Sequence, residues 1–294
     1  MDQAEQLRNI IKANNGPQRP TARVITVTSG KGGVGKSNTA INLAIQFRKM
    51  GQRVIILDAD FGLANIEIMF GTVPKHNLCD LIYQGKNIRD IITWGPGDVG
   101  FISGGSGIVG LSNLSRDYLI YIIQNLAQLD AIADIILIDT GAGISDAVLE
   151  FLVASGEILL VTTPEPTSIT DSYSLLKALT RHPRFSQEES KIKVIANRVE
   201  RMEEGQSLFN KLNVVVARYL KLPLTYLGAI PRDEKLSEAV MQQVPVSLKN
   251  PAAKSSVCYE MMAAELMNIE YSKKLKKRGM AAFFSYIVNS KKFK

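Results

Sequence analysis

The octapeptide at residues 30–37, Gly-Lys-Gly-Gly-Val-Gly-Lys-Ser, constrains this chain more than any other feature. It fits the phosphate-binding pattern G-x-x-x-x-G-K-[S/T], with an additional lysine, Lys31, at the first variable position. The β-branched, apolar run before it predicts a buried strand, and residues 38–50 have the apolar spacing of a helix. A glycine-rich loop between a strand and a helix predicts a nucleotide-binding site.

The residue types in this loop suit phosphate chemistry. Glycines let the backbone adopt positive φ and approach phosphate oxygens without an intervening Cβ. The loop amides and the positive end of the following helix attract an anion. Lys36 supplies a point charge to the outer phosphates, and the Ser37 hydroxyl is the expected magnesium ligand. We expect the following loop residues to contact the nucleotide: Gly30, Lys31, Gly32, Gly33, Val34, Gly35, Lys36, Ser37 and Asn38.

Aspartates follow two other predicted strands. Asp58 and Asp60 come directly after the second strand, where the carboxyl ends of parallel strands converge on the nucleotide. One of them can orient water near the γ-phosphate while the other supports magnesium or the loop lysines. Asp139 ends an aliphatic strand, as a Walker B aspartate does, and should reach the magnesium through a water. We therefore expect Ser37, Asp58 and Asp139 to form the metal site.

Two glycines follow Asp139. Gly141 and Gly143 permit a mobile loop that can sense the γ-phosphate. This arrangement predicts a segment whose conformation depends on the bound nucleotide.

Strands and helices alternate from residue 23 to about residue 270. This alternation predicts an α/β fold with a doubly wound, mainly parallel sheet covered by helices on both faces, as in P-loop NTPases. The predicted strands are 23–28, 53–57, 99–102, 134–138, 157–162, 191–196 and 225–229.

The pattern divides the chain into three parts. Residues 1–22 predict a helical extension that ends near an Asn-Asn-Gly-Pro turn. Residues 23–272 form the nucleotide-binding domain, which a helix over 253–272 closes. Residues 273–294 form a basic, amphipathic tail.

Charge is concentrated in that tail. The chain has a formal net charge of +7, and residues 273–294 carry eight lysines and arginines without an acidic residue. The rest of the chain is close to neutral, which disfavours nucleic-acid binding by the folded domain. Apolar residues at i, i+3, i+4 and i+7 beside this basic run predict a short helix that contacts an anionic membrane surface. The predicted membrane residues are Lys276, Lys277, Met280, Phe283, Phe284 and Ile287.

An alternative for this helix is packing into a hydrophobic groove of its own domain. The two arrangements are compatible if ATP displaces a docked helix.

Several classes of protein are disfavoured by the sequence. The two cysteines, Cys79 and Cys258, form no C-x-x-C pair, so neither a zinc knuckle, an iron–sulfur site nor a metal-cluster carrier is indicated. No apolar run approaches the roughly 20 residues of a membrane span, and no secretory leader is evident. We expect a cytoplasmic protein.

The loop and the two aspartate motifs together make the chain similar to the MinD/ParA family of deviant-Walker ATPases, from about residue 23 to residue 250. The resemblance implies an ATP-dependent homodimer in which Lys31 crosses to the partner's phosphates. It implies catalytic roles for Lys31, Lys36 and Asp60, with Asp60 positioning the attacking water. Asp58 and Asn65 belong to the same switch.

The resemblance also extends to the part of the site that surrounds the base. Family positions that frame the base match Asn197, Arg198, Pro231, Arg232 and Asp233. The guanine-reading N-K-x-D motif is absent from the sequence, so ATP and ADP, with Mg²⁺, are the expected ligands.

Within this family the chain is most similar to the flagellar branch, which includes proteins called FlhG, YlxH or FleN. Residues 58–65 and 139–143 have the motif sequences that are typical of that branch. Residues 2–8 resemble its D-Q-A-x-x-L-R activator segment. The resemblance implies control of flagellar number, placement and assembly, with C-ring proteins as partners. It also implies slow turnover, ATP-bound protein on the inner face of the cell membrane, and stimulation of an FlhF-type GTPase. The implied contacts to that GTPase are Asp2, Gln3, Ala4, Leu7 and Arg8.

Two related functions remain as alternatives: placement of the division septum and ParA-like partitioning of DNA. A scaffold that binds ATP without hydrolysing it is disfavoured, because Lys36, Asp60 and Asp139 are all present.

Overall fold

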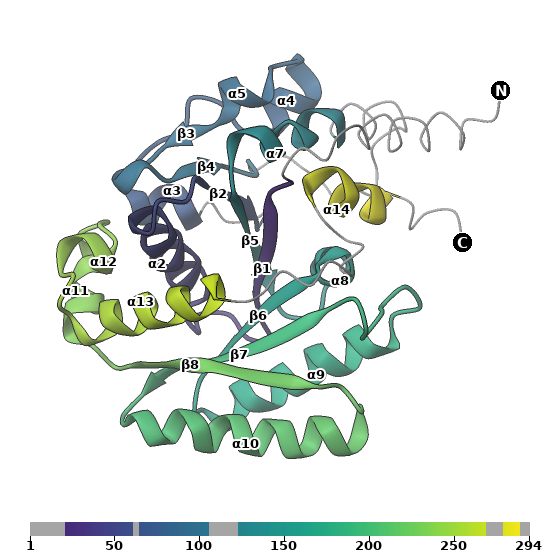
Figure 1. Ribbon diagram of the computed structural model, residues 1–294, viewed down its shortest axis with the longest axis vertical. Helices are drawn as coiled ribbons and strands as arrows, with labels where there is room; N and C mark the ends of the chain where they lie inside the picture. The colour runs from purple at the N-terminus through teal and green to yellow at the C-terminus, as the bar shows by residue number, and fades with distance from the viewer. Residues whose placement is uncertain (1–20, 61–64, 106–122, 269–278, 289–294) are drawn as a thin grey trace.

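The computed structural model describes residues 21–60, 65–105, 123–268 and 279–288. Its centre is an eight-stranded sheet in the order β3-β4-β2-β5-β1-β6-β7-β8 (Figure 1). Every neighbouring pair is parallel except β3 and β4. The predicted α/β class and mainly parallel, doubly wound sheet are confirmed.

Each predicted strand is present, with ends that shift by a few residues. The sequence did not predict the antiparallel edge strand β3, because a strand of two residues is too short to give a periodic signal. The strands are β1 (Arg23–Ser29), β2 (Val54–Ala59), β3 (Thr93–Trp94), β4 (Gly100–Ile102), β5 (Ile135–Ala142), β6 (Glu157–Thr162), β7 (Lys191–Val199) and β8 (Leu224–Pro231).

Helices cover both faces of the sheet, some in the connections between strands and others after the last strand (Figure 1). They are α2 (Lys36–Lys49), α3 (Asn65–Phe70), α4 (Leu78–Gln84), α5 (Ile88–Ile91), the 3₁₀ turn η1 (Pro96–Asp98), α7 (Leu129–Ile132), α8 (Asp146–Ala154), α9 (Pro166–Arg181), α10 (Met202–Tyr219), α11 (Glu234–Met241), α12 (Val246–Lys249), α13 (Lys254–Met267) and α14 (Gly279–Val288). Among the described residues, none of these helices has both the length and the apolarity needed to cross a bilayer.

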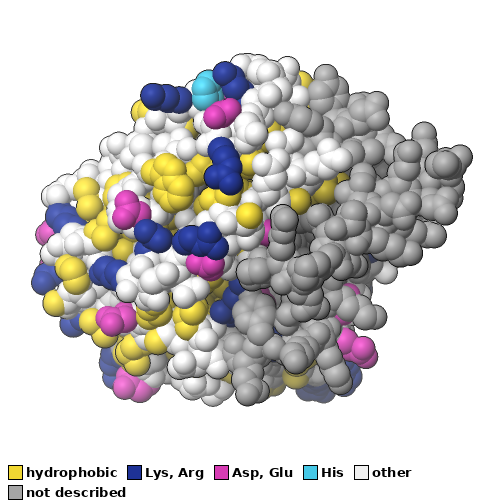
Figure 2. All heavy atoms as spheres, turned by 45° about the horizontal axis from the view of Figure 1, so that its top comes forward, with side chains coloured by type: hydrophobic (Ala, Val, Ile, Leu, Met, Phe, Trp, Pro, Cys, Tyr) yellow, Lys and Arg dark blue, Asp and Glu magenta, His cyan; other side chains and the backbone are white. Residues whose placement is uncertain are grey.

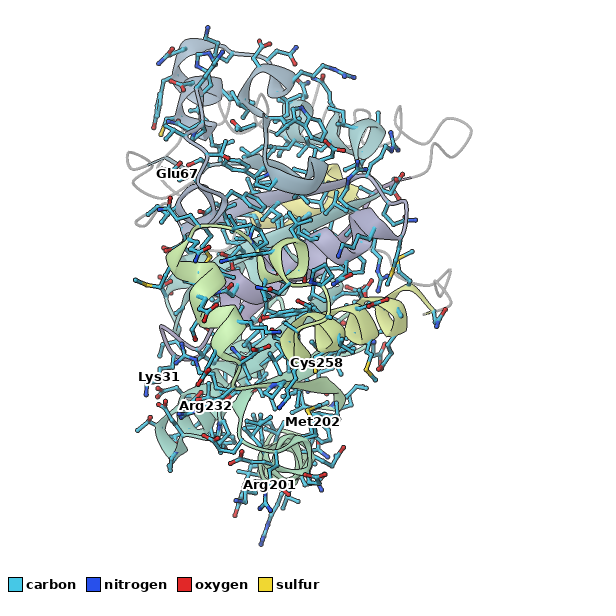
Figure 3. The ribbon with its side chains drawn as sticks, turned by 90° about the vertical axis from the view of Figure 1, so that its left-hand side faces the viewer. Lys31, Glu67, Arg201, Met202, Arg232 and Cys258 are labelled. Carbon is cyan, nitrogen blue, oxygen red and sulfur yellow. The ribbon has the colours of Figure 1, made fainter. Side chains whose placement is uncertain are left out.

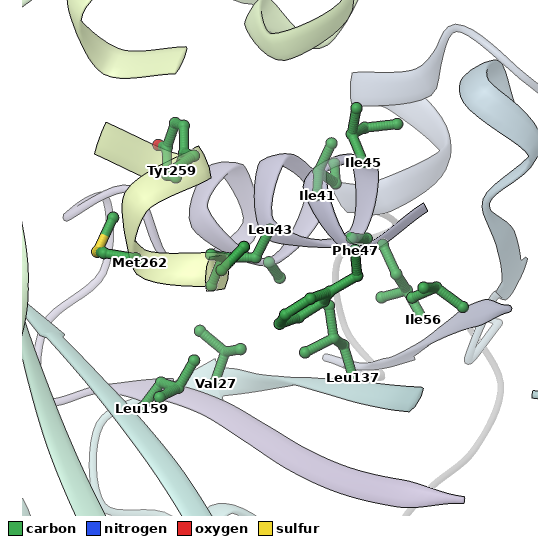
Figure 4. Close-up of a cluster of buried hydrophobic side chains, with 14 of the residues drawn as sticks. Val27, Ile41, Leu43, Ile45, Phe47, Ile56, Leu137, Leu159, Tyr259 and Met262 are labelled. Atoms are coloured by element: carbon green, nitrogen blue, oxygen red, sulfur yellow. The ribbon is translucent and has the colours of Figure 1, made fainter. Parts of the chain in front are cut away.

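Alternate strand residues supply two different hydrophobic layers. Val27 and Leu137 point toward α2 and α13, where they join Phe47 and Met262 in one buried cluster (Figure 4). Because successive side chains of a strand point to opposite faces, the intervening residues, such as Ile138, belong to the cluster on the other face. The two layers explain why the central strands are apolar at nearly every position.

Helix α14 is part of the second layer. Met280, Phe283, Phe284 and Ile287 are each less than a tenth exposed and pack in the cluster on the second face. The ring of Phe151 in α8 lies 5.8 Å from that of Phe283 and 6.4 Å from that of Phe284. The structure therefore shows the docked arrangement, and membrane contact by these four residues stays a prediction that requires α14 to leave its groove.

Other predicted features lie outside the described residues. They are the N-terminal helix with its contacts Asp2, Gln3, Ala4, Leu7 and Arg8, and the basic residues Lys276 and Lys277. The predicted closing helix over 253–272 is present as α13, which ends at Met267.

Docking of α14 makes a prediction about stability. Phe284→Ala should lower the free energy of unfolding by about 3 kcal/mol, because the substitution empties a buried aromatic site. Val257→Ala on α13 is the control, since Val257 is 42% exposed and its truncation should cost about 0.5 kcal/mol or less. Urea unfolding of both variants measures the difference. Equal losses would contradict the docked position of α14.

Candidate nucleotide-binding site

The glycine-rich loop joins the end of β1 to the start of α2. Gly33 and Gly35 have φ of 75° and 95°, a left-handed conformation that favours glycine. Gly35 caps α2 without a side-chain hydrogen bond to the first helical amides. A Cβ added at Gly32 or Gly33 would meet no atom within 4 Å, so the loop borders open space. Free amides, a helix N-terminus and open space together form a cradle that fits phosphate.

Lys36 and Asp139 form a buried ion pair beneath this cradle. The Lys36 Nζ atom lies 2.7 Å from Asp139 Oδ1 and 3.3 Å from the Ser37 hydroxyl oxygen. Burial raises the pKa of Asp139, and the Lys36 ammonium opposes the rise. The second carboxylate oxygen, Oδ2, is buried and accepts no hydrogen bond of normal geometry.

This orphaned oxygen provides a test of the predicted magnesium site. A buried carboxylate oxygen without a donor, close to a serine hydroxyl, fits the oxygen preference of Mg²⁺. In the described part of the chain, no group of three or more His, Cys, Asp or Glu side chains is arranged to hold a metal ion by itself. Mg²⁺ bound to a nucleotide needs few protein ligands. Ser37 and Asp139 would hold the ion, which when bound neutralises phosphate charge.

Asp58 holds both ends of the segment that carries Asp60. Its Oδ1 accepts the Asp60 N–H at 3.1 Å, and its Oδ2 accepts the Ile66 N–H at 3.3 Å. Burial and the charge of Asp139 raise the pKa of Asp58 to about 7. Both carboxylate oxygens of Asp58 therefore accept backbone hydrogen bonds in this structure. Its role as a metal ligand stays a prediction.

Asp60 is close to the end of the Walker B strand. Its Oδ2 accepts a hydrogen bond from the Asn65 side-chain amide at 3.2 Å. A Cβ built on Gly141 would lie 3.7 Å from Asp60 Oδ1. The predicted water-positioning residue and the predicted γ-phosphate sensor are therefore neighbours in space, as the sequence motifs require.

Lys31 is bound to its own chain in this structure. Its Nζ donates to Glu165 Oε2 and to Thr167 Oγ1, both at 2.8 Å. Both partners lie at the start of α9, and the Lys31 interaction holds the pKa of the Glu165 carboxyl below its usual value. The sequence analysis did not identify Glu165 or Thr167. The Glu-Pro-Thr sequence shortly after β6 could have identified both residues, because the carboxyl ends of parallel strands share one edge of the sheet.

The base-framing residues come together at the ends of β7 and β8. In the register of these strands Asn197 lies opposite Ile230, and the Arg232 N–H donates to the Val199 carbonyl. Arg198 has a left-handed φ of 59°. Arg232 pairs with Glu200 and emerges at the same side of the molecule as Lys31 (Figure 3).

Two of these residues also have structural roles. The Asn197 amide donates to the Val34 carbonyl at 2.7 Å and so attaches β7 to the phosphate loop. Asp233 caps α11 through Lys235 N–H and accepts two hydrogen bonds from Ser255. Their predicted contacts with the base stay predictions.

Gly35→Ala should weaken ATP binding about tenfold or more. The backbone there is left-handed, and the new Cβ would lie 2.2 Å from the Asn197 amide nitrogen. Gly51→Ala is the matched control, because Gly51 has φ of 84° but open space around its Cβ position and lies beyond the C-terminus of α2. Titration with a fluorescent ATP analogue measures both affinities. Equal affinities would argue against a cradle that depends on Gly35.

Asp58 should make stability depend on pH. Its folded pKa of about 7 lies above the unfolded value, so the unfolded chain releases its proton first and stability falls as pH rises toward 7. Between pH 5 and pH 7 the wild type should lose roughly 2 kcal/mol relative to Asp58→Asn, which cannot titrate. Urea unfolding of both proteins across this range measures the loss. A pH-independent difference would show that Asp58 ionises normally.

Two curated proteins are similar to this chain over most of its length. The antiactivator FleN of Pseudomonas aeruginosa is 40% identical over 244 residues, which is 83% of this chain and 86% of FleN. The flagellum site-determining protein YlxH of Helicobacter pylori is 34% identical over 248 residues, which is 82% of each chain.

Solved structures share the fold. The cell division ATPase MinD of Pyrococcus furiosus superposes with a TM-score of 0.66 at 23% identity, over 85% of this chain and all of MinD. A septum site-determining MinD from Pyrococcus horikoshii, solved with Mg-ADP, gives a TM-score of 0.65 over 84% of this chain and 96% of its own. The model of the CobQ/CobB/MinD/ParA nucleotide-binding domain matches residues 25–246. With the phosphate cradle, the Lys36–Asp139 pair and Lys31 in place, this chain belongs to the MinD/ParA family of P-loop ATPases.

Proposed function

We propose that this protein is an ATP-driven switch that controls the number and placement of flagella. The proposal is supported by a phosphate-binding loop that carries the additional lysine Lys31, in a chain whose 40%- and 34%-identical relatives are FleN and YlxH. YlxH is named as a flagellum site-determining protein, and FleN is named as an antiactivator.

Dimerisation across Lys31 is the proposed switch. In the single chain Lys31 is held by Glu165 and Thr167, with its side chain about a third exposed. An exposed ion pair of this kind contributes little free energy, so the phosphates of a partner's ATP can compete for the ammonium group. ATP thus favours the state in which each Lys31 leaves Glu165 and neutralises phosphate charge in the other subunit.

Hydrolysis would reverse the switch. Asp60 is placed to orient the attacking water, and Asp58 fixes the two ends of the segment that carries it. Lys36 would turn from Asp139 toward the outer phosphates. Slow turnover suits this role, because a switch needs residence time in each state.

Membrane attachment would use α14 and the basic residues before it. The four apolar side chains of α14 cannot face the core and a bilayer at once. Each stabilises the docked state by about 1.5–3 kcal/mol, so docking and membrane insertion compete. Two helices brought together in a dimer bind a surface better than one, which links attachment to ATP.

The remaining partners are proposed from the resemblance alone. Residues 2–8 would stimulate an FlhF-type GTPase, and the folded domain would contact C-ring proteins. The ATP-bound dimer would act on the cytoplasmic face of the cell membrane.

Septum-site placement is the second candidate, because proteins named for it are also similar to the chain. One is the chloroplast MinD homologue of Arabidopsis thaliana, which is 27% identical in an alignment that covers 95% of this chain and 87% of the homologue. DNA partitioning has less support. Basic and acidic side chains are interspersed on the described part of the face in Figure 2, without a continuous basic surface.

Deletion of the gene separates the first two functions. Altered flagellar number or position with normal division supports the flagellar role. Minicells with normal flagella would support septum placement and overturn our proposal.

Substitutions at Lys31 and Asp60 should have opposite effects on the dimer. Lys31→Ala should abolish ATP-dependent dimers, because phosphate charge in the partner is no longer neutralised. Asp60→Ala should retain them, because the attacking water is no longer positioned. Light scattering after size exclusion, with ATP and with ADP, measures both. Persistent ATP-dependent dimers of the lysine variant would rule out the role of Lys31 across the interface.

Membrane attachment should depend on both ATP and the tail. Liposomes with anionic lipid should sediment the intact chain with ATP but not with ADP, and should sediment neither state of a chain that ends at Lys274. Neutral liposomes are the control for the basic residues. Equal sedimentation of the truncated chain would contradict a membrane role for α14.

A further inference from the structure

We propose that the carboxylate of Asp130 is a shared anchor that couples the docking of α14 to the position of Ala22, where residues 1–21 enter the domain. The coupling means that a change at either end of the chain alters how firmly the other end is held. The anchor itself needs neither a membrane nor a partner, so it stands apart from the function proposed above.

Two backbone donors from opposite ends of the chain meet on this one side chain. Asp130 belongs to the single-turn helix α7, and its Oδ1 accepts the N–H of Met280 in the first turn of α14 at 3.1 Å. The N–H of Ala22 also faces this carboxylate and, with that of Met280, lowers its pKa. A carboxylate at a helix N-terminus also interacts favourably with the helix dipole.

Gly279 permits this close approach. Its φ is 76°, and a Cβ built on it would lie 2.4 Å from Asp130 Oδ2. Only a glycine allows the chain to enter α14 in this conformation while leaving room for the carboxylate. The position of this glycine, directly before the apolar residues of α14, is therefore explained by the anchor.

The packing around the anchor connects the same two ends. Ala22 is 2% exposed and belongs to the hydrophobic cluster that contains Met280, Phe283 and Phe284. The next residue, Arg23, donates its N–H to the carbonyl of Asp134 at 2.8 Å. The segment from Asp130 to Asp134 therefore fixes two successive residues of the entering chain, and one of these contacts is shared with α14.

The energetic link follows from desolvation. Partial burial raises the pKa of Asp130 to about 6, and the N–H groups of Met280 and Ala22 oppose the rise. A partly desolvated carboxylate that loses one N–H neighbour has to recruit water or rotate, and either change disturbs its interaction with the other N–H group. Coupling between two sites is reciprocal, so movement of Ala22 must weaken α14 as much as loss of α14 weakens the hold on Ala22.

Amide hydrogen exchange of the full chain, read residue by residue by NMR, tests the anchor. Asp130→Asn should accelerate exchange at both Ala22 and Met280 about tenfold, because each N–H loses its interaction with a charged carboxylate. Residues 136–138 of β5 should keep their rates. Glu260→Gln, on the exposed side of α13, is the matched control and should change neither amide.

A second variant tests the coupling itself. Ala22→Pro removes one donor and leaves Asp130 and α14 unaltered, so a faster Met280 amide can arise only through the shared carboxylate or the shared packing. Adding Asp130→Asn to Ala22→Pro separates these, because a shared carboxylate predicts that the double variant matches Asp130→Asn at Met280. A Met280 rate in Ala22→Pro that equals the wild type overturns the coupling. Acceleration that is equal at residues 136–138 also overturns it, since it reports general destabilisation.

If residues 2–8 bind a GTPase as proposed, the anchor gives that partner a route to α14. Force or ordering at residues 1–21 would reach Ala22 first and α14 through Asp130. This consequence depends on the proposed function, whereas the exchange experiments do not.

Discussion

The buried ion pair between Lys36 and Asp139 is the interaction on which the site depends. It joins the first residue of α2 to the strand β5, and so fixes the phosphate loop against the Walker B element at 2.7 Å. An unpaired charge at this depth would be strongly destabilising, so neither residue can be lost without the other being exposed or neutralised. In the proposed switch, nucleotide phosphate would replace Asp139 as the partner of Lys36. The ion pair would then stabilise the fold without nucleotide and break when nucleotide binds.

The loops around this pair are held by hydrogen bonds to neighbouring elements. Asn197 attaches β7 to the phosphate loop, Asp58 holds the segment that bears Asp60, and Glu165 holds Lys31. In the switch that we propose, phosphate of a second subunit would compete with Glu165 for Lys31. A bound nucleotide would act on several of these loops together, because they share one edge of the sheet.

Ala22 and α14 are attached to the domain by shared packing and by one carboxylate. Helix α14 contributes four side chains to the cluster that Ala22 and Phe151 also join. Its apolar face is therefore the same surface that the sequence predicts for membrane contact. Periodicity identifies an amphipathic helix but gives no information about which apolar surface covers it, since a bilayer and a protein groove satisfy the same pattern.

The sequence alone determined the α/β fold and the identity of the phosphate loop, because strand–glycine loop–helix order and the positions of Lys36, Ser37 and Asp139 are local properties of the chain. It also determined the candidate residues Lys31 and Asp60. The tertiary structure decided where Lys31 is held and that α14 is docked. It also decided that Asp58 and Asp233 use their oxygens in structural hydrogen bonds. Contacts such as Lys31–Glu165 and Met280–Asp130 join residues 134 and 150 positions apart, so no local pattern encodes them.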